Sequence, residues 1–164
     1  MPGWVDLSIA LVFAGALLLE FRRGFGRAVF DLAALLVAMR ATWMLNDPMS
    51  NSVHLVLDHS ANHAVMYFGG FLVIGALLVV LGRLLHSTTL VSTDVFEPML
   101  GGVCGLAIAT IVSHALVQGL ALGAGTNAIP ESVANSAMGM EFLRFGTYHQ
   151  VLEFLYNFHR EPVG

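Results

Sequence analysis

Four polar residues interrupt the long apolar stretches of this sequence: Asp31, Arg40, His114 and Gln118. His114 and Gln118 are four residues apart, a spacing that places both side chains on one face of an α-helix. Burying such groups among apolar residues is costly, so they are candidates for an intramembrane polar path that conducts ions or protons. An interhelical hydrogen bond is the alternative interpretation of the same residues.

Three arginines surround Gly24 directly after the first apolar stretch, namely Arg22, Arg23 and Arg27. Near an anionic leaflet each cation contributes about 1 kcal/mol of attraction, so this segment is a candidate for contact with lipid headgroups or an acidic partner. Arginines in this position also act as a signal that sets the orientation of a membrane protein. Arg27 and Asp31 are four residues apart and could pair along a helix.

Small residues recur at every fourth position in the last apolar stretch, at Gly101, Gly105, Ala109 and Ser113. Such a stripe lets two helix backbones approach closely, which is the main source of helix association in lipid. The stripe therefore predicts helix packing within the protein, with contact between copies as the alternative.

His59 and His63 have the i, i+4 spacing of zinc-binding histidines, and Asp58 lies beside them. The sequence lacks the HEXXH pattern and has no cysteine near these histidines, so we predict no metal site. It also lacks a serine or cysteine nucleophile motif and a phosphate-binding glycine loop. We therefore expect no catalytic residues, no cofactor and no enzymatic activity.

The composition is that of a membrane protein. Of the 164 residues 57% are hydrophobic and 11% are charged, against roughly 25% charged in ordinary soluble domains. A helix needs roughly 20 apolar residues to cross a bilayer, and residues 64–82 contain no charge. The fold class is therefore all-α, a polytopic integral membrane protein. The formal net charge is −4, and without a clustered basic face no nucleic-acid partner is expected.

A transmembrane domain is predicted over residues 1–125, and its four spans cover residues of about 4–21, 28–45, 64–82 and 99–123. Charges weaken the first two spans, so a re-entrant hairpin is the alternative for that pair. Residues 126–164 are predicted to form a tail outside the cytoplasm, with an amphipathic helix lying in the membrane surface.

The orientation follows from the arginines at the ends of the predicted spans. Arg22, Arg23, Arg27 and Arg83 all lie where the odd-numbered spans end, and cytoplasmic loops are enriched in such residues. We therefore expect these ends in the cytoplasm and both chain termini in the periplasm.

The order of motifs resembles that of the colicin V production protein (CvpA) family of bacterial inner-membrane proteins. The resemblance rests on Trp4-Val5-Asp6 at the start of the first span, on Arg22-Arg23-Gly24-Phe25-Gly26-Arg27 after it, and on Leu100-Gly101-Gly102-Val103-Cys104-Gly105 at the start of the fourth. Ala28 stands where the family usually has an acidic residue, and Pro98 where it has an arginine. The chain therefore resembles a divergent member.

This resemblance implies an inner-membrane protein required for colicin V production and linked to cell-envelope homeostasis, without an established enzymatic activity. We expect a non-enzymatic scaffold or accessory factor in toxin production, export or envelope homeostasis. A small channel or transporter subunit is the alternative, and a metal-dependent membrane enzyme is a third hypothesis. The expected partners are the lipid bilayer and other membrane proteins or further copies of the chain.

Overall fold

The computed structural model describes residues 3–86, 96–125 and 129–145, and these contain helices without any strand. The helices are α1 (Trp4–Arg23), α2 (Phe25–Ser52), α3 (His59–His86), α4 (Glu97–Gly123), α5 (Glu131–Ala134) and α6 (Ala137–Arg144). The first four are long and apolar enough to cross a membrane. The prediction of an all-α fold with four candidate spans is confirmed.

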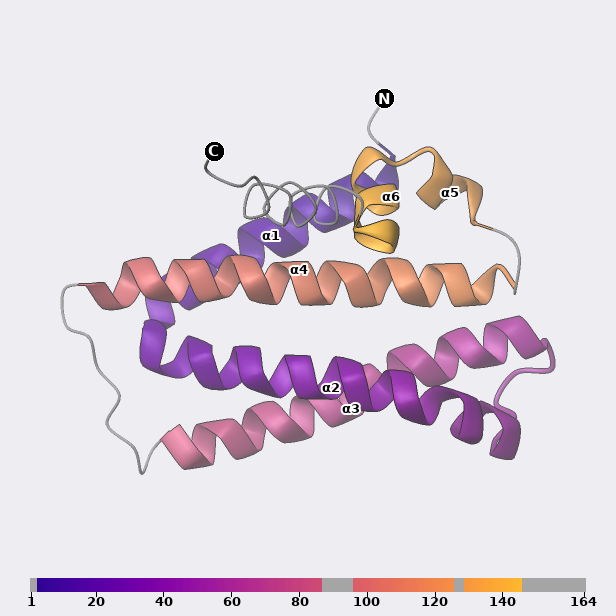
Figure 1. Cartoon of the computed structure of the whole chain (residues 1–164), viewed down its shortest axis with the longest axis horizontal. Coiled ribbons are helices and arrows are strands. Elements are labelled where there is room, and N and C mark those ends of the chain that lie inside the picture. Colours follow the sequence, from indigo (N-terminus) through magenta and orange to yellow (C-terminus); the bar gives the residue numbers. More distant parts are fainter. Residues whose placement is uncertain (1–2, 87–95, 126–128, 146–164) are drawn as a thin grey trace, which may run out of the picture.

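The four long helices run in alternating directions and form one bundle (Figure 1). Helices α1 and α2 contain 20 and 28 residues, which correspond to lengths of about 30 and 42 Å. Each is long enough for a full crossing, which favours two spans over a re-entrant hairpin. A single residue joins them: Gly24 has φ of 82°, a left-handed conformation that glycine adopts without steric cost.

Helix α4 is the central helix of the bundle. It packs against α1, α2 and α3, whereas α2 packs mainly against α3. In its span 56% of the residues are buried, against 17% in the span of α1. The main apolar core joins α2, α3 and α4 and consists of Ala38, Tyr67, Phe71, Ile111 and Ala115.

Glycines on α4 lie directly against the backbone of α1. A Cβ atom added at Gly101 would lie 2.5 Å from the carbonyl oxygen of Glu20, and one at Gly105 would lie 2.8 Å from that of Ala16. Ala109 and Ser113 continue this stripe and are completely buried. The small-residue stripe thus lies in an internal interface between α1 and α4.

Helix α6 packs on α1 and α4 (Figure 1). Its N-terminus is held by Asp6 of α1, whose Oδ1 accepts hydrogen bonds from the Ser136 hydroxyl at 2.6 Å and the Met138 N–H at 3.1 Å. Ser136 also caps the helix, because its hydroxyl accepts from the Gly139 N–H at 2.7 Å. The described start of the predicted tail is therefore attached to the bundle, while its residues 146–164 lie outside the described part.

Replacing Ser136 with alanine is expected to loosen this attachment. The variant loses both the helix cap and the bond to Asp6, which together contribute about 1 to 2 kcal/mol. Hydrogen exchange of the amides of residues 137–144 should therefore become about tenfold faster or more. Ser8→Ala removes an exposed hydroxyl that bonds only within its own helix, so unchanged exchange in that variant is the control. Equal exchange in both variants would contradict the role given to Ser136.

Candidate functional site

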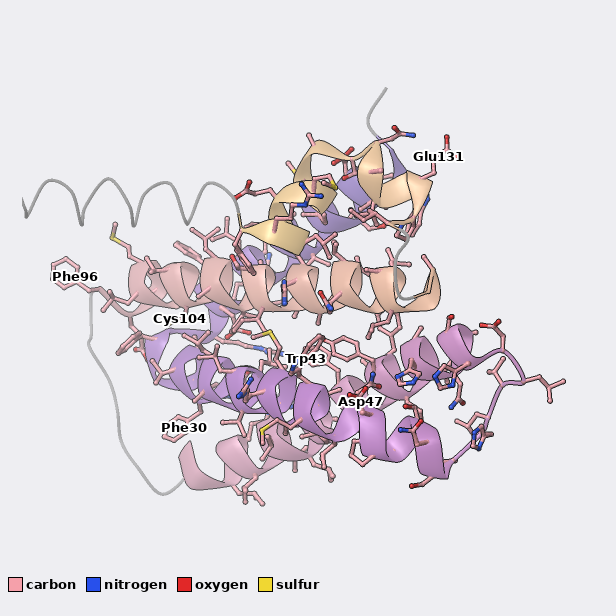
Figure 2. The ribbon with its side chains drawn as sticks, turned by 45° about the vertical axis from the view of Figure 1, so that its right-hand side comes forward. Phe30, Trp43, Asp47, Phe96, Cys104 and Glu131 are labelled. Carbon is pink, nitrogen blue, oxygen red and sulfur yellow. The ribbon has the colours of Figure 1, made fainter. Side chains whose placement is uncertain are left out.

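A pocket of about 340 Å³ lies between α2, α3 and α4, and it is lined by Met39, Arg40, Trp43, Tyr67, His114 and Gln118. Arg40, His114 and Gln118 belong to the predicted polar path. They come together because α2 and α4 pack side by side and both present polar groups at the same level. Figure 2 shows Trp43 between the ribbons of α2 and α4.

His114 connects this pocket with α6. Its Nδ1 lies 2.7 Å from the carbonyl oxygen of Phe142, and its ring centroid lies 4.9 Å from that of Phe145. Because a carbonyl oxygen only accepts hydrogen bonds, Nδ1 must be the donor. Nε2 is then the ring atom left for other partners. Phe142 lies in the last turn of α6, where carbonyl groups have no donor within the helix. The bond from His114 supplies a donor to one of these carbonyls.

Arg40 contributes the positive charge of the pocket. Its side chain is exposed at the surface of the bundle, and no carboxylate of the described residues lies within 4.0 Å of its guanidinium. Trp43 is one helical turn further along α2 and meets the ring of Tyr67 edge-on, with centroids 6.5 Å apart. The pocket therefore combines one cation with two aromatic walls.

Asp31 lies apart from this pocket, so the four polar residues do not form one site. Its Oδ2 is 3.5 Å from the Arg23 guanidinium, which also binds Glu20 Oε1 at 3.0 Å. Both acids are buried. Asp31 pairs with Arg23 rather than with Arg27, because the turn at Gly24 brings the end of α1 beside the start of α2.

The arginines predicted to contact lipid or a partner differ in their surroundings. Arg23 is engaged in the two ion pairs, and Gly24 is buried beneath the side chain of Glu97, whose Cγ would lie 2.8 Å from a Cβ at that position. Arg22 and Arg27 are exposed at this end of the bundle. These two are in neither ion pair, whereas the partly exposed Arg23 is held by Glu20 and Asp31.

A second polar cluster joins the end of α2 to the start of α3, where His59 and His63 lie in the first turns of α3. The completely buried Asn62 makes four hydrogen bonds: its Nδ2 donates to the carbonyls of Ser50 and Val53, and its Oδ1 accepts from the N–H groups of Leu55 and Val56. These bonds satisfy loop backbone groups that would otherwise be unpaired. The cluster thus holds the loop in place.

His63 belongs to this cluster, with Nδ1 at 3.0 Å from the Ser50 hydroxyl and 3.2 Å from the Asn46 amide nitrogen. The ring of His59 lies beside it, with centroids 4.6 Å apart. Within the described residues, no group of three or more His, Cys, Asp or Glu side chains is arranged to hold a metal ion. The contacts of His63 are those of a residue that joins two helices.

Sequence reasoning missed Trp43, Tyr67 and Glu20. The spacing of three residues between Arg40 and Trp43 places both on one face of α2, so this pair was detectable. Tyr67 enters the pocket through the register between α2 and α3, which no local pattern encodes. Glu20 is buried beside Asp31 because the tight turn at Gly24 brings the end of α1 next to the start of α2.

Comparison with curated proteins found no match to this chain, and comparison with solved structures found none either. The family model described as Colicin V production protein matches residues 5–144. This range covers α1 to α6 and includes the pocket and the ion-pair cluster. The match thus extends over most of the chain, including the four helices that are long and apolar enough to cross a membrane. The chain belongs to the Colicin V production protein family.

Proposed function

We propose that this protein is a non-enzymatic scaffold or accessory factor of the bacterial inner membrane that supports toxin production, export or envelope homeostasis. Family membership and the four candidate spans support this proposal. Arg22, Arg27 and Arg83 are exposed, and they belong to the helix ends that the positive-inside rule assigns to the cytoplasm. The proposed orientation therefore has both termini in the periplasm.

The separation of the polar residues carries the choice of a scaffold over a channel. Asp31 and Arg40 are nine residues apart on α2, which corresponds to about 14 Å along the helix axis. The buried positions between them are Ala34 and Ala38, which offer no polar group to an ion or a proton. A conducting path through one protomer would need polar side chains or water along this interval. The geometry thus favours a protein that works through its surfaces.

The outward faces of the bundle are the surfaces available to other membrane proteins. On α3 the exposed apolar residues include Leu72, Val73, Leu77, Val80 and Leu81. Residues of this kind contact either lipid tails or the helices of a partner. Arg22 and Arg27 add exposed cations at the proposed cytoplasmic end.

Site-specific photocrosslinking in intact cells tests the scaffold proposal. A photoreactive residue at Leu77, which is 66% exposed, is expected to capture other envelope or export proteins, and one at Phe71, which is 8% exposed, is the buried control on the same helix. Adducts at Leu77 that identify such proteins, and none at Phe71, would support the proposal. An absence of protein adducts at Leu77 and at the equally outward Leu11 would contradict it. Ion flux in reconstituted vesicles that His114→Leu abolishes would favour the channel instead.

A further inference from the structure

We propose that the pocket between α2, α3 and α4 binds the anionic headgroup of a membrane lipid, with the Arg40 guanidinium paired to the lipid phosphate. This inference goes beyond the scaffold role, because it assigns a ligand to a particular cavity. It rests on the charge of the pocket, on its depth in the bundle and on the side from which it opens.

The positive charge of the pocket favours an anionic ligand. Arg40 carries a cationic guanidinium, and no aspartate or glutamate is among the described residues that line the cavity. The indole N–H of Trp43, the amide of Gln118 and the hydroxyl of Tyr67 add further hydrogen-bond donors. A guanidinium can bind two phosphate oxygens at once, which makes arginine well suited to this anion.

The pocket lies well inside the ends of the helices, and its cation is unpaired among the described residues. His114 lies nine residues before the end of α4 at Gly123, so the pocket is about 14 Å inside that end of the helix. Pairing with an anion lowers the cost of holding a cation on a surface that faces lipid. No carboxylate of the described residues lies within 4.0 Å of the guanidinium, so an anionic ligand would supply that partner.

The pocket opens on the outer surface of the bundle, which supports a lipid rather than a free phosphate ion. Trp43 is 50% exposed whereas Tyr67, at the floor of the pocket, is 1% exposed. In a membrane this outer surface of α2 faces lipid, so a ligand enters sideways from the bilayer. Met39 and Trp43 provide apolar walls beside Arg40 for the part of the lipid next to the phosphate. The volume of about 340 Å³ is within the range of small-ligand pockets.

Tryptophan fluorescence can report on this pocket directly. The sequence has two tryptophans, so Trp4→Phe leaves Trp43 as the only one. We expect phosphatidylglycerol with brominated acyl chains, titrated into nanodiscs, to quench Trp43 at about a tenfold lower mole fraction than brominated phosphatidylcholine does. Equal quenching by the two lipids would overturn the proposal without any further variant.

Matched variants in this single-tryptophan background identify the cation responsible. Arg40→Gln should abolish the preference for the anionic lipid, and Arg40→Lys should keep part of it, because lysine retains the charge without the bidentate geometry. Arg27→Gln, which removes an exposed arginine from the same helix, should leave the preference unchanged. A preference that survives in Arg40→Gln, or that disappears in Arg27→Gln, would overturn the assignment. So would release of the lipid by inorganic phosphate in the millimolar range, since it would indicate a site for the free ion.

Discussion

Gly101→Val should lower the free energy of unfolding by about 3 kcal/mol, the upper part of the range for overpacked interiors. The first atom of the new side chain would lie 2.5 Å from the carbonyl oxygen of Glu20 and 3.0 Å from the carbonyl carbon of Gly24. Both atoms belong to the backbone of α1 and its turn, so neither can rotate away as a side chain would. Helix α1 must move away from α4, and the contacts along the whole stripe weaken with it. Thermal unfolding of the purified protein in detergent measures the loss.

Gly15→Ala is the matched control, because a Cβ atom at that position meets nothing within 4 Å. Gly15 lies on α1, the helix that packs against Gly101 of α4. Alanine stabilises a helix relative to glycine by up to about 1 kcal/mol. The unfolding temperature of this variant should therefore stay the same or rise. If Gly101→Val unfolds at the same temperature as the unmodified protein, the close approach of α1 and α4 does not exist in the membrane protein as purified.

The spans and the small-residue stripe could be predicted from sequence because each depends on a local pattern. Length and apolarity define a crossing helix, and a spacing of four residues defines one face. The helix that packs against Gly101 and Gly105 could not be predicted in this way. Its identity depends on how four similar apolar helices are ordered in the bundle, and no local pattern on α4 distinguishes α1 from α3.

The candidate site was predictable in part. His114 and Gln118 share a face of one helix by their spacing, and both line the pocket. The spacing of Asp31 and Arg40 already argues against placing both in one polar path. Nine residues correspond to two and a half helical turns, so the two side chains lie on opposite sides of α2. The contact of Asp31 with Arg23 could not be predicted, since it depends on the turn at Gly24 and on the angle between α1 and α2.

Arg23→Gln is expected to lower the free energy of unfolding by about 2 to 3 kcal/mol. This is below the cost of breaking a fully buried ion pair, because 34% of the Arg23 side chain is exposed. The variant leaves Glu20 and Asp31 buried at 4% and 6% exposure with no described cation within 4.0 Å. Glu20 is especially affected, since its Oε2 has no hydrogen-bond partner among the described residues even with Arg23 present. Unfolding in detergent near neutral pH measures the loss.

Arg22→Gln separates this effect from a general loss of positive charge at the same helix end. Arg22 is exposed and adjacent in sequence, and it belongs to neither ion pair, so its replacement should change stability by less than about 0.5 kcal/mol. Adding Glu20→Gln to Arg23→Gln removes one of the two stranded carboxylates and should restore part of the stability. A double variant no more stable than Arg23→Gln alone would mean that Arg23 stabilises the bundle by packing its stem, not by neutralising the buried acids.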